Sequence, residues 1–453
     1  MDRNEAQYIK MTATPVPRLI LALAAPTVLS MLVTTLYNTA DTFFVSQLGT
    51  SASAAVGVVF SLMAIFQAIG FTLGSGAGSL VALRLGAKDE DAANRFTSTS
   101  FFSAIGCGLI FTLYGVIDID HLMTALGSTP TILPYSRSYA SYILLGAPVM
   151  CASFVMNNVL RSEGKSALAM TGLVSGGVLN IVLDPIFIFT FELGIAGAAI
   201  ATLISQCVSF AILFSFFLRR KCISRIHVKY FSRRAADYIA VIKLGFASLC
   251  RQGLSSIATV ALIVSAAAYG DAAVAAMSIT GRIFMLIFSV VLGIGQGFMP
   301  VAGFNCGAKR YARVRESVWF TIKAGAVMMI LLGGLGFIFA PQVIALFRDD
   351  PEVIRIGGFA MRVQCAVMIC MPFFTTTNMA HQSTGRAAVA TFLACNRHGL
   401  YFLPLIALLP RFLGVTGVQI AQPLSDVLSF MTCLPFLRHF LRETRELERS
   451  AAQ

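Results

Sequence analysis

Long apolar runs alternate with short polar connections along the whole chain. About twelve such runs can be counted, near residues 18–46, 54–83, 97–117, 134–159, 167–190, 195–217, 243–268, 275–305, 317–340, 355–380, 387–409 and 416–437. An α-helix rises about 1.5 Å per residue, so runs of this length can cross the roughly 30 Å hydrocarbon core of a bilayer. The runs are continuous, whereas a transmembrane β-strand would alternate apolar and polar positions over about ten residues. The pattern predicts an all-α polytopic membrane protein with twelve transmembrane helices.

The two halves of the chain repeat one another at an offset of 221 residues. Gly74–Lys88 matches Gly295–Lys309, and Glu163–Lys165 matches Thr384–Arg386. Each half holds six spans, an even number, so the halves have the same orientation and are related by an axis along the membrane normal. We therefore predict two pseudo-symmetric six-helix lobes joined by a basic loop. The first lobe, the loop and the second lobe comprise residues 1–218, 219–241 and 242–453.

Composition and charge narrow the class of protein further. Hydrophobic residues make up 57% of the chain and charged residues 12%, too few to cover a soluble surface. The net charge of +13 could indicate a nucleic-acid partner, but Lys and Arg gather in alternate connections, as the positive-inside rule describes. We predict that both termini are cytoplasmic and that no nucleic acid is bound. The polar start leads straight into the first span, which would act as an uncleaved signal anchor in a prokaryotic cytoplasmic (inner) membrane.

Charged and amide side chains within the first and fifth spans are candidates for a functional site. Asp41 lies in the first span, and an ionisable residue there costs several kcal/mol, so it marks an ion or substrate pathway by default. Asn180 and Asp184 are four residues apart and share one helix face. Pro185 cannot donate a hydrogen bond to the carbonyl of Ile181. Carboxylate, amide and free carbonyl oxygens are suitable ligands for a hard cation.

The depths of these residues agree. Asp41, Asp184 and Thr202 each lie five to seven residues from the outer end of their span, roughly 10 Å inside the membrane at ~1.5 Å per residue. We predict a cation-coupling site formed by Asp41, Asn180, Asp184 and Thr202. Two carboxylates in one low-dielectric site require either a bound cation such as Na⁺ or a proton on one of them. The sequence leaves these two alternatives open.

The repeat provides a control for this interpretation. The offset of 221 places Asp41 opposite Leu262 and Pro26 opposite Ala247. If the fold itself required these polar groups, the second lobe would need them as well. The first lobe therefore carries a specialised site.

The second lobe has charged residues of its own. Arg397 and Asp426 lie near mid-membrane in adjacent spans. Either would be an unpaired charge in lipid if it stood alone, so we predict that they form a structural ion pair. The alternative is a substrate contact. The roles of Arg251 and Arg282, also within spans, stay open.

Several further residues are candidates for gating or substrate contact. Pro26 can let the first span bend, so that its carboxylate moves when the cation is exchanged, although a static kink is the alternative. The 18 Met and 36 Phe residues would suit a cavity for varied lipophilic guests. The candidates that we name are Pro26, Tyr37, Asn38, Gln296, Met31 and Met63.

Several motifs resemble those of the multidrug and toxic compound extrusion (MATE) transporter family, and the resemblance covers essentially the whole chain. They are Pro26 with Asn38 and Asp41, Arg84-Leu85-Gly86-Ala87-Lys88, Arg161-Ser162-Glu163-Gly164-Lys165, Asn180-Ile181-Val182-Leu183-Asp184-Pro185, Gln296-Gly297-Phe298-Met299-Pro300, Gly307-Ala308-Lys309 and Arg397-His398-Gly399. The resemblance implies Na⁺- or H⁺-driven export of organic, often cationic, drugs. It also implies that Asp41, Asn180, Asp184 and Thr202 match the cation-site positions of the DinF-like branch.

The chain departs from the other, NorM-like branch of that family. That branch has acidic residues in spans 7 and 10, but Leu244–Ala268 and Phe359–Ala380 contain none. The resemblance therefore assigns coupling to the first lobe. His398 stands where the family more often has Gln, and its role stays open.

Two other functions compete with a secondary multidrug exporter that works as an antiporter. A lipid-linked oligosaccharide flippase shares the general architecture, but such flippases tend to have cationic cavities and extra spans, whereas this chain has twelve spans and two cavity carboxylates. An enzyme is disfavoured because the sequence has no metal-ligand His cluster, nucleophile motif or phosphate-binding Gly-rich loop. We expect a monomer that transports small-molecule drugs, with Na⁺ or H⁺ as the coupling ion and no other cofactor.

Overall fold

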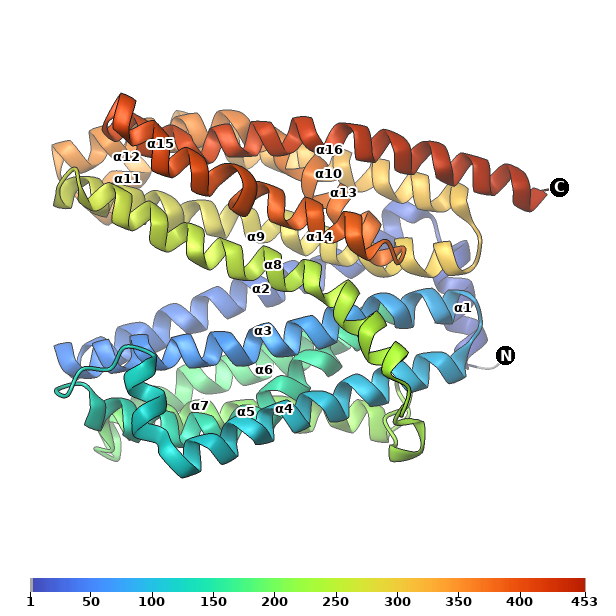
Figure 1. Cartoon of the computed structure of the whole chain (residues 1–453), viewed down its shortest axis with the longest axis horizontal. Coiled ribbons are helices and arrows are strands. Elements are labelled where there is room, and N and C mark those ends of the chain that lie inside the picture. The colour runs from blue at the N-terminus through green and yellow to red at the C-terminus, as the bar shows by residue number, and fades with distance from the viewer. Residues whose placement is uncertain (1–2, 453) are drawn as a thin grey trace. The chain divides into compact units, whose positions relative to one another are not determined.

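The computed structural model describes residues 3–452 and is helical throughout, apart from turns and connections (Figure 1). Twelve helices in this range are long and apolar enough to cross a membrane, which confirms the predicted twelve spans. The first six are α2 (Val16–Ser46), α3 (Thr50–Gly86), α4 (Glu90–Ala125), α5 (Leu133–Ser162), α6 (Ser166–Pro185) with the π-helical turn η1 (Ile186–Thr190), and α7 (Gly194–Leu218).

The second six spans include two that are built from several helical pieces. These six are α8 (Ala235–Ala267), α9 (Asp271–Gly307), α10 (Tyr311–Ile338), α12 (Pro351–Val367) with η3 (Met368–Cys370) and α13 (Met371–Ser383), α14 (Ala387–Cys395) with η4 (Asn396–Phe402) and α15 (Leu403–Leu413), and α16 (Val415–Ala452). Three shorter elements lie outside the spans: α1 (Arg3–Ala13), η2 (Val228–Tyr230) and α11 (Ala340–Phe347).

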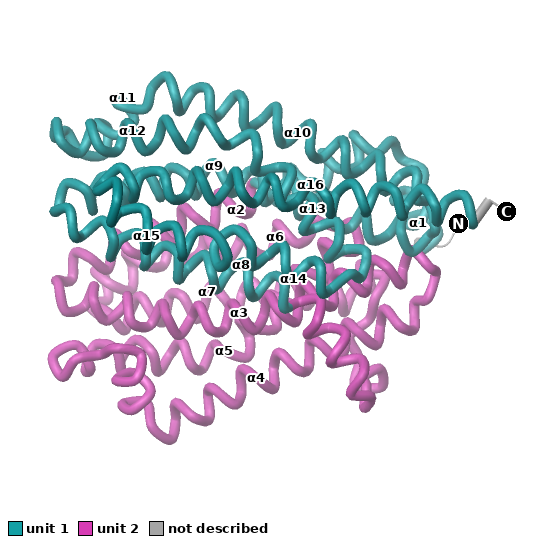
Figure 2. Tube along the Cα trace, turned by 45° about the horizontal axis from the view of Figure 1, so that its top comes forward, with its two compact units in different colours: residues 1–28, 246–453 teal, residues 29–245 magenta. Residues whose placement is uncertain are grey.

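The chain forms two compact units (Figure 2). Unit 1 contains residues 1–28 and 246–453, and unit 2 contains residues 29–245. The boundaries differ from the predicted lobes, because the first part of α2 groups with unit 1 and the basic connection groups with unit 2. That connection is also shorter than predicted, since α8 already begins at Ala235. The chain therefore passes between the units inside two helices, α2 and α8.

Glycines allow the first part of each of these helices to pack closely on a neighbouring helix. In unit 2, a Cβ on Gly76 of α3 would overlap the carbonyl of Val241, and one on Gly245 would overlap the carbonyl of Thr72. The start of α8 therefore packs backbone against backbone on α3. In unit 1, Gly293 and Gly297 of α9 pack in the same way on α2, against Val28 and Ala24.

The repeat predicted from the sequence is visible in individual hydrogen bonds. Asn157 Nδ2 donates to the carbonyl of Ala169 at 2.9 Å in unit 2, and Asn378 Nδ2 donates to the carbonyl of Ala390 in unit 1. Both residues of the second bond lie 221 positions after those of the first.

The first parts of α2 and α8 correspond to each other with a different sequence offset from the rest of the repeat. The glycine contacts pair Ala24 with Val241 and Val28 with Gly245, which are 217 positions apart, so the offset is about one helical turn smaller there. By this pairing Asp41 corresponds to Ala258 rather than Leu262, and Pro26 to Lys243 rather than Ala247. The earlier assignment of these counterparts was wrong, because the offset does not hold across the helices that join the units. The conclusion that Asp41 has no acidic counterpart is unchanged.

The close approach of α8 to α3 predicts a strong effect of side-chain size. Gly245→Leu should destabilise the protein by about 1–3 kcal/mol or more, because overpacking forces the two backbones apart. Gly253→Leu is the matched control, since Gly253 lies on the same helix with open space around it. Thermal unfolding in detergent measures the difference, and equal melting temperatures for the two variants would contradict the packing described here.

Candidate cation and substrate site

The four residues predicted to form a cation site belong to unit 2, where hydrogen bonds join three of them and the fourth, Asp41, interacts electrostatically with Asp184. Asp41 comes from α2, Asn180 and Asp184 from α6, and Thr202 from α7. All four are buried, and Asp184 is fully so, with exposures of 4%, 4%, 0% and 7% in the same order. Asn180 Nδ2 donates to Asp184 Oδ1 at 3.1 Å and to Thr202 Oγ1 at 3.3 Å. The amide of Asn180 thus ties α6 to α7 and fixes one oxygen of the Asp184 carboxylate.

The local structure explains how these helices present their oxygens. Pro185 ends the regular part of α6, and the chain continues as the π-helical turn η1 before α7 begins. Asp41 lies five residues before the end of α2, Asp184 six before the end of η1, and Thr202 eight after the start of α7. At about 1.5 Å per residue these depths agree to within one helical turn. The depth argument made from the sequence is therefore consistent with the contacts.

The two carboxylates lack a basic partner. None of the ion pairs among residues 3–452 involves Asp41 or Asp184. Asp41 Oδ1 and Asp184 Oδ2 also accept no hydrogen bond from the protein. Buried carboxylates without compensation are costly, so this arrangement favours uptake of a cation or a proton. The unpaired carboxylate oxygens, together with the hydroxyl of Thr202, suit a hard cation that prefers oxygen ligands.

Tyr139 is a part of this site that the sequence interpretation missed. It lies on α5, is fully buried, and its side chain interacts with that of Thr202. It interacts electrostatically with both Asp41 and Asp184. Tyr139 is six residues from the start of α5, about the same depth as the carboxylates, and this depth is the signal that could have identified it.

A transition-metal centre is not indicated. The residues that the structure describes contain no group of three or more His, Cys, Asp or Glu side chains able to hold a metal ion. Because the site combines two carboxylates with hydroxyl and amide groups, its chemistry fits a monovalent hard cation or a proton better than a soft metal.

The candidates for substrate contact and gating are spread over both units. In unit 2, Tyr37 is one turn before Asp41 and packs against Gly177 of α6, where an added Cβ would lie 3.0 Å from the Tyr37 ring. Met31 and Met63 are half-buried, and Asn38 is exposed and makes no side-chain hydrogen bond to the carboxylate cluster. Pro26 and Gln296 belong to unit 1.

Arg397 and Asp426 lie in direct contact in unit 1. Arg397 Nε donates to Asp426 Oδ1 at 2.6 Å, and the carboxylate also accepts from Gln364 at 2.8 Å and Gln422 at 3.0 Å. Three phenylalanine rings surround the guanidinium at 4.9–5.3 Å; they belong to Phe284, Phe288 and Phe374. Asp426 thus has the cationic partner that Asp41 and Asp184 lack, which favours a structural role for the pair.

The three residues whose roles the sequence left open, Arg251, Arg282 and His398, differ in burial and in their partners. Arg251 donates to Asn378 Oδ1 at 3.0 Å and to Ser248 Oγ at 3.3 Å. Arg282 is exposed. His398 is buried, and its Nε2 lies 3.4 Å from an Nη atom of Arg397, while its Nδ1 has no partner.

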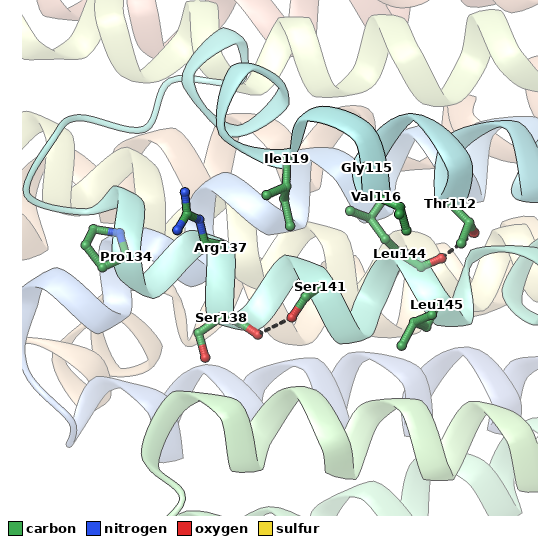
Figure 3. A pocket seen from close by; sticks show the side chains of 10 residues that line it. All are labelled: Thr112, Gly115, Val116, Ile119, Pro134, Arg137, Ser138, Ser141, Leu144 and Leu145. Carbon is green, nitrogen blue, oxygen red and sulfur yellow. Dashed lines mark hydrogen bonds between the residues drawn. The ribbon is translucent and has the colours of Figure 1, made fainter.

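A cavity of about 490 Å³ lies elsewhere in unit 2, between α4 and α5 (Figure 3). Its lining is mostly apolar, with Arg137 towards one end and Thr112, whose hydroxyl donates to the Leu144 carbonyl, towards the other. None of the residues predicted for the cation site lines it. This cavity therefore gives no support to a substrate pocket at the carboxylates.

The ion pair in unit 1 generates a prediction. Asp426→Leu should destabilise the protein by about 3–5 kcal/mol, because it leaves Arg397 buried without its partner. Arg397→Met combined with Asp426→Leu should recover much of that loss, since both charges are then gone. Thermal unfolding of the single and double variants measures this, and a double variant no more stable than the single one would argue against the pair as a structural element.

Three comparisons place the chain among known proteins. The family model described as MatE matches residues 26–186 and 246–404. The multidrug export protein MepA of Staphylococcus saprophyticus is 26% identical over 400 residues, which cover 87% of each chain.

Solved structures are similar over nearly the whole length. An outward-facing multidrug resistance MATE family transporter of the MOP superfamily superposes with a TM-score of 0.90 at 27% identity, covering 97% of this chain and 98% of that one. A MOP superfamily transporter from Pyrococcus furiosus, whose reversed pocket polarity suggests a different function, gives a TM-score of 0.88 at 27% identity, with 96% and 98% covered.

Proposed function

This chain belongs to the MatE family of transporters, and from that premise we propose that it exports organic, often cationic, compounds by cation-coupled antiport. Multidrug export is the activity named for the relatives that match 87% or more of this chain. The observation that carries the coupling proposal is the pair of buried carboxylates, Asp41 and Asp184, without a basic partner. The coupling ion is Na⁺ or H⁺, the protein works as a monomer, and both termini lie in the cytoplasm.

The proposed cycle follows from the charge state of this pair. When the site is open to the outside, Asp41 and Asp184 take up the cation, and Asn180 and Thr202 complete the ring of polar groups. Neutralisation removes the electrostatic attraction of the site for a cationic drug, so the drug is released. The cation-loaded protein then changes from the outward-open to the inward-open conformation and releases the cation into the cytoplasm.

Movement of the carboxylate is coupled to the first span in this scheme. Asp41 lies in the part of α2 that belongs to unit 2, whereas Pro26 lies in the part that belongs to unit 1. Between them, the hydroxyls of Thr27, Thr34 and Thr35 donate to carbonyls four residues earlier, and such bonds slightly weaken and often bend helices. Cation uptake at Asp41 can therefore change the shape of α2 at a point where that helix is already adaptable.

Transport in proteoliposomes tests this function directly. Uptake of ethidium should be driven by an imposed Na⁺ gradient or an imposed pH gradient, and the effective gradient identifies the coupling ion. Asp41→Asn and Asp184→Asn should each reduce driven uptake at least tenfold, because the site then cannot exchange its charge. Asp91→Asn is the matched control, an exposed carboxylate of unit 2, and should transport normally.

Transport that ignores both gradients, or that survives in Asp41→Asn, would contradict the coupling proposal. That result would favour the alternative function, a lipid-linked oligosaccharide flippase. The Pyrococcus relative with reversed pocket polarity supports keeping that alternative in view, because it indicates that this architecture hosts more than one function. Translocation of a fluorescent lipid-linked sugar would be the assay for it.

Coupling through one site also predicts mutual weakening of drug and cation binding. The affinity for ethidium, measured by fluorescence polarisation, should fall when the coupling cation is added, and the affinity for the cation should fall by the same factor when ethidium is added. Asp184→Asn should abolish this dependence. Independent, additive binding in the unsubstituted protein would rule the scheme out.

A further inference from the structure

The connection between α7 and α8 carries a concentrated positive charge. Residues 219–234 contain seven Lys or Arg residues and no Asp or Glu. The first acidic residue after them is Asp237, which pairs with Arg95 of α4 at 3.1 Å and also accepts the hydroxyl of Ser232. The connection therefore has an excess of positive charge that its own sequence does not balance.

Four of these basic side chains are exposed and lack a carboxylate partner. They are Arg225, Lys229, Arg233 and Arg234. None of the four forms an ion pair with a carboxylate of residues 3–452. Their cationic groups can therefore contact an anionic partner outside the chain.

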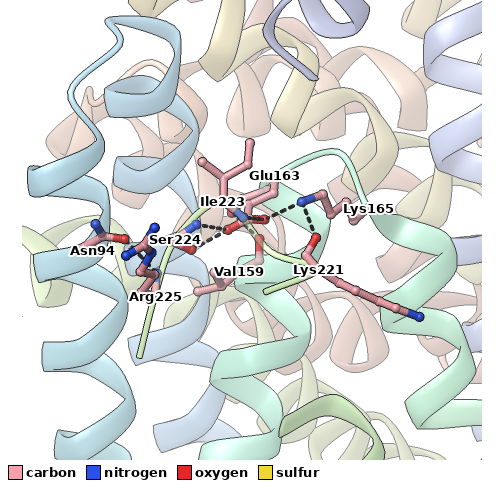
Figure 4. Close-up of polar contacts among 9 residues, drawn as sticks. Asn94, Val159, Glu163, Lys165, Lys221, Ile223, Ser224 and Arg225 are labelled. Carbon is pink, nitrogen blue, oxygen red and sulfur yellow. Dashed lines mark hydrogen bonds and ion pairs between the residues drawn. The ribbon is translucent and has the colours of Figure 1, made fainter. Parts of the chain in front are cut away.

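The backbone of the connection is held in place by other residues of unit 2. Glu163, directly after α5, accepts the backbone N–H groups of Ile223 and Ser224, each at 2.8 Å (Figure 4). Asn94 Oδ1 of α4 accepts the N–H of Arg225 at 2.6 Å. These contacts are made to the backbone, so the basic side chains are not needed to fix the segment.

The connection folds back along α4 to the depth of the membrane surface. The Thr99 hydroxyl of α4 accepts the N–H of Ser232 at 3.0 Å, and the rings of Phe102 and Phe231 meet edge to face with centroids 6.0 Å apart. Phe102 lies five residues inside the apolar run 97–117, about 8 Å from its end. This depth places Phe231 near the boundary between lipid headgroups and acyl chains.

Exposed apolar side chains accompany the basic ones. Val228 is 70% exposed and Phe231 is 40% exposed, although both are hydrophobic. Val228 begins the short turn η2, which also contains Lys229. At a membrane surface, apolar side chains enter the interface while Lys and Arg contact anionic headgroups. The combination found here is typical of a segment that lies on a membrane.

We propose that the segment 225–234 binds anionic phospholipids at the membrane surface. Its four exposed basic side chains contact the headgroups, and Val228 enters the interface. The charges are complementary, because an anionic lipid supplies the negative charge that the segment lacks and a zwitterionic lipid has no net charge. The connection follows the sixth span, so the lipids belong to the leaflet on the side of the chain termini. Naming this the cytoplasmic leaflet rests on the proposed orientation.

The end of α16 in unit 1 provides a matched control. It contains four exposed arginines, Arg438, Arg442, Arg445 and Arg449. Carboxylates are interspersed among them in the sequence, and Arg442 pairs with Glu446 at 2.9 Å. Replacing these four arginines by glutamine changes the net charge by the same amount as in the connection, but removes charges that carboxylates accompany.

Fluorescence quenching by brominated lipids tests lipid binding at the segment itself. Val228→Trp places a reporter there, and the signal of the one native tryptophan, Trp319, is subtracted with the unsubstituted protein. The purified full-length variant in dodecylmaltoside is titrated with brominated phosphatidylglycerol or brominated phosphatidylcholine. Phosphatidylglycerol should half-quench the reporter at a roughly fivefold lower mole fraction, the ratio that one basic side chain near an anionic surface provides. NaCl at about 1 M should remove this preference by screening.

Charge-removing variants of the reporter protein identify the residues responsible. Glutamine at all four of the basic positions named in segment 225–234 should abolish the preference for phosphatidylglycerol, whereas glutamine at the four arginines of α16 should preserve it. Equal quenching by the two lipids, or a preference that survives removal of the four charges of the segment, would overturn the proposal. Absence of quenching by either lipid would also overturn it, since Val228 would then lie away from the lipid. None of these measurements requires transport, so their outcome is independent of the proposed function.

Discussion

Two carboxylates share a buried site, and no basic side chain among residues 3–452 forms an ion pair with either, a constraint on which the proposed mechanism depends. Asp41 and Asp184 come from different helices, α2 and α6, and each keeps an oxygen without a protein donor. The contrast with Asp426 is direct, because that carboxylate is neutralised by Arg397 and two glutamine amides. Asp426 is thus part of a completed structural contact, whereas Asp41 and Asp184 each keep a carboxylate oxygen that accepts no hydrogen bond from the described residues.

The helices that join the two units connect the carboxylate site to the boundary between the units. The helix that carries Asp41 is also one of the two helices through which the chain passes between the units. Its start is packed against the glycines of α9, and the start of α8 is packed against α3. The carboxylate of Glu163 also holds the connection that precedes α8, because it accepts the backbone N–H groups of Ile223 and Ser224. In the proposed cycle, a change at Asp41 therefore acts directly on one of the two helices that join the units.

The two halves share a helical scaffold but differ in their buried polar residues. The paired bonds of Asn157 and Asn378 show the same scaffold in both. The buried polar residues differ between the halves. The first half has two carboxylates without an ion-pair partner, one of them near the end of α6, and the second half has an ion pair whose arginine, Arg397, lies in the π-helical segment η4. Wide π-turns often occur where a helix is adapted to function, and here they accompany the polar clusters in both halves.

The sequence by itself determined the twelve spans and the repeat, and it predicted a cation site whose residues Asn180, Asp184 and Thr202 the structure joins by hydrogen bonds. It could do so because a bilayer forces long apolar helices and makes every buried charge conspicuous. Depth counting along the helices was enough to bring Asp41, Asp184 and Thr202 to one level. Only the tertiary structure decided which helix faces meet, and so it added Tyr139 and left Asn38 outside the cluster. It alone also revealed that the units exchange the starts of α2 and α8 and that Glu163 holds the basic connection, because these contacts join residues far apart in the chain, and no local pattern encodes which backbone a buried glycine or carboxylate will touch.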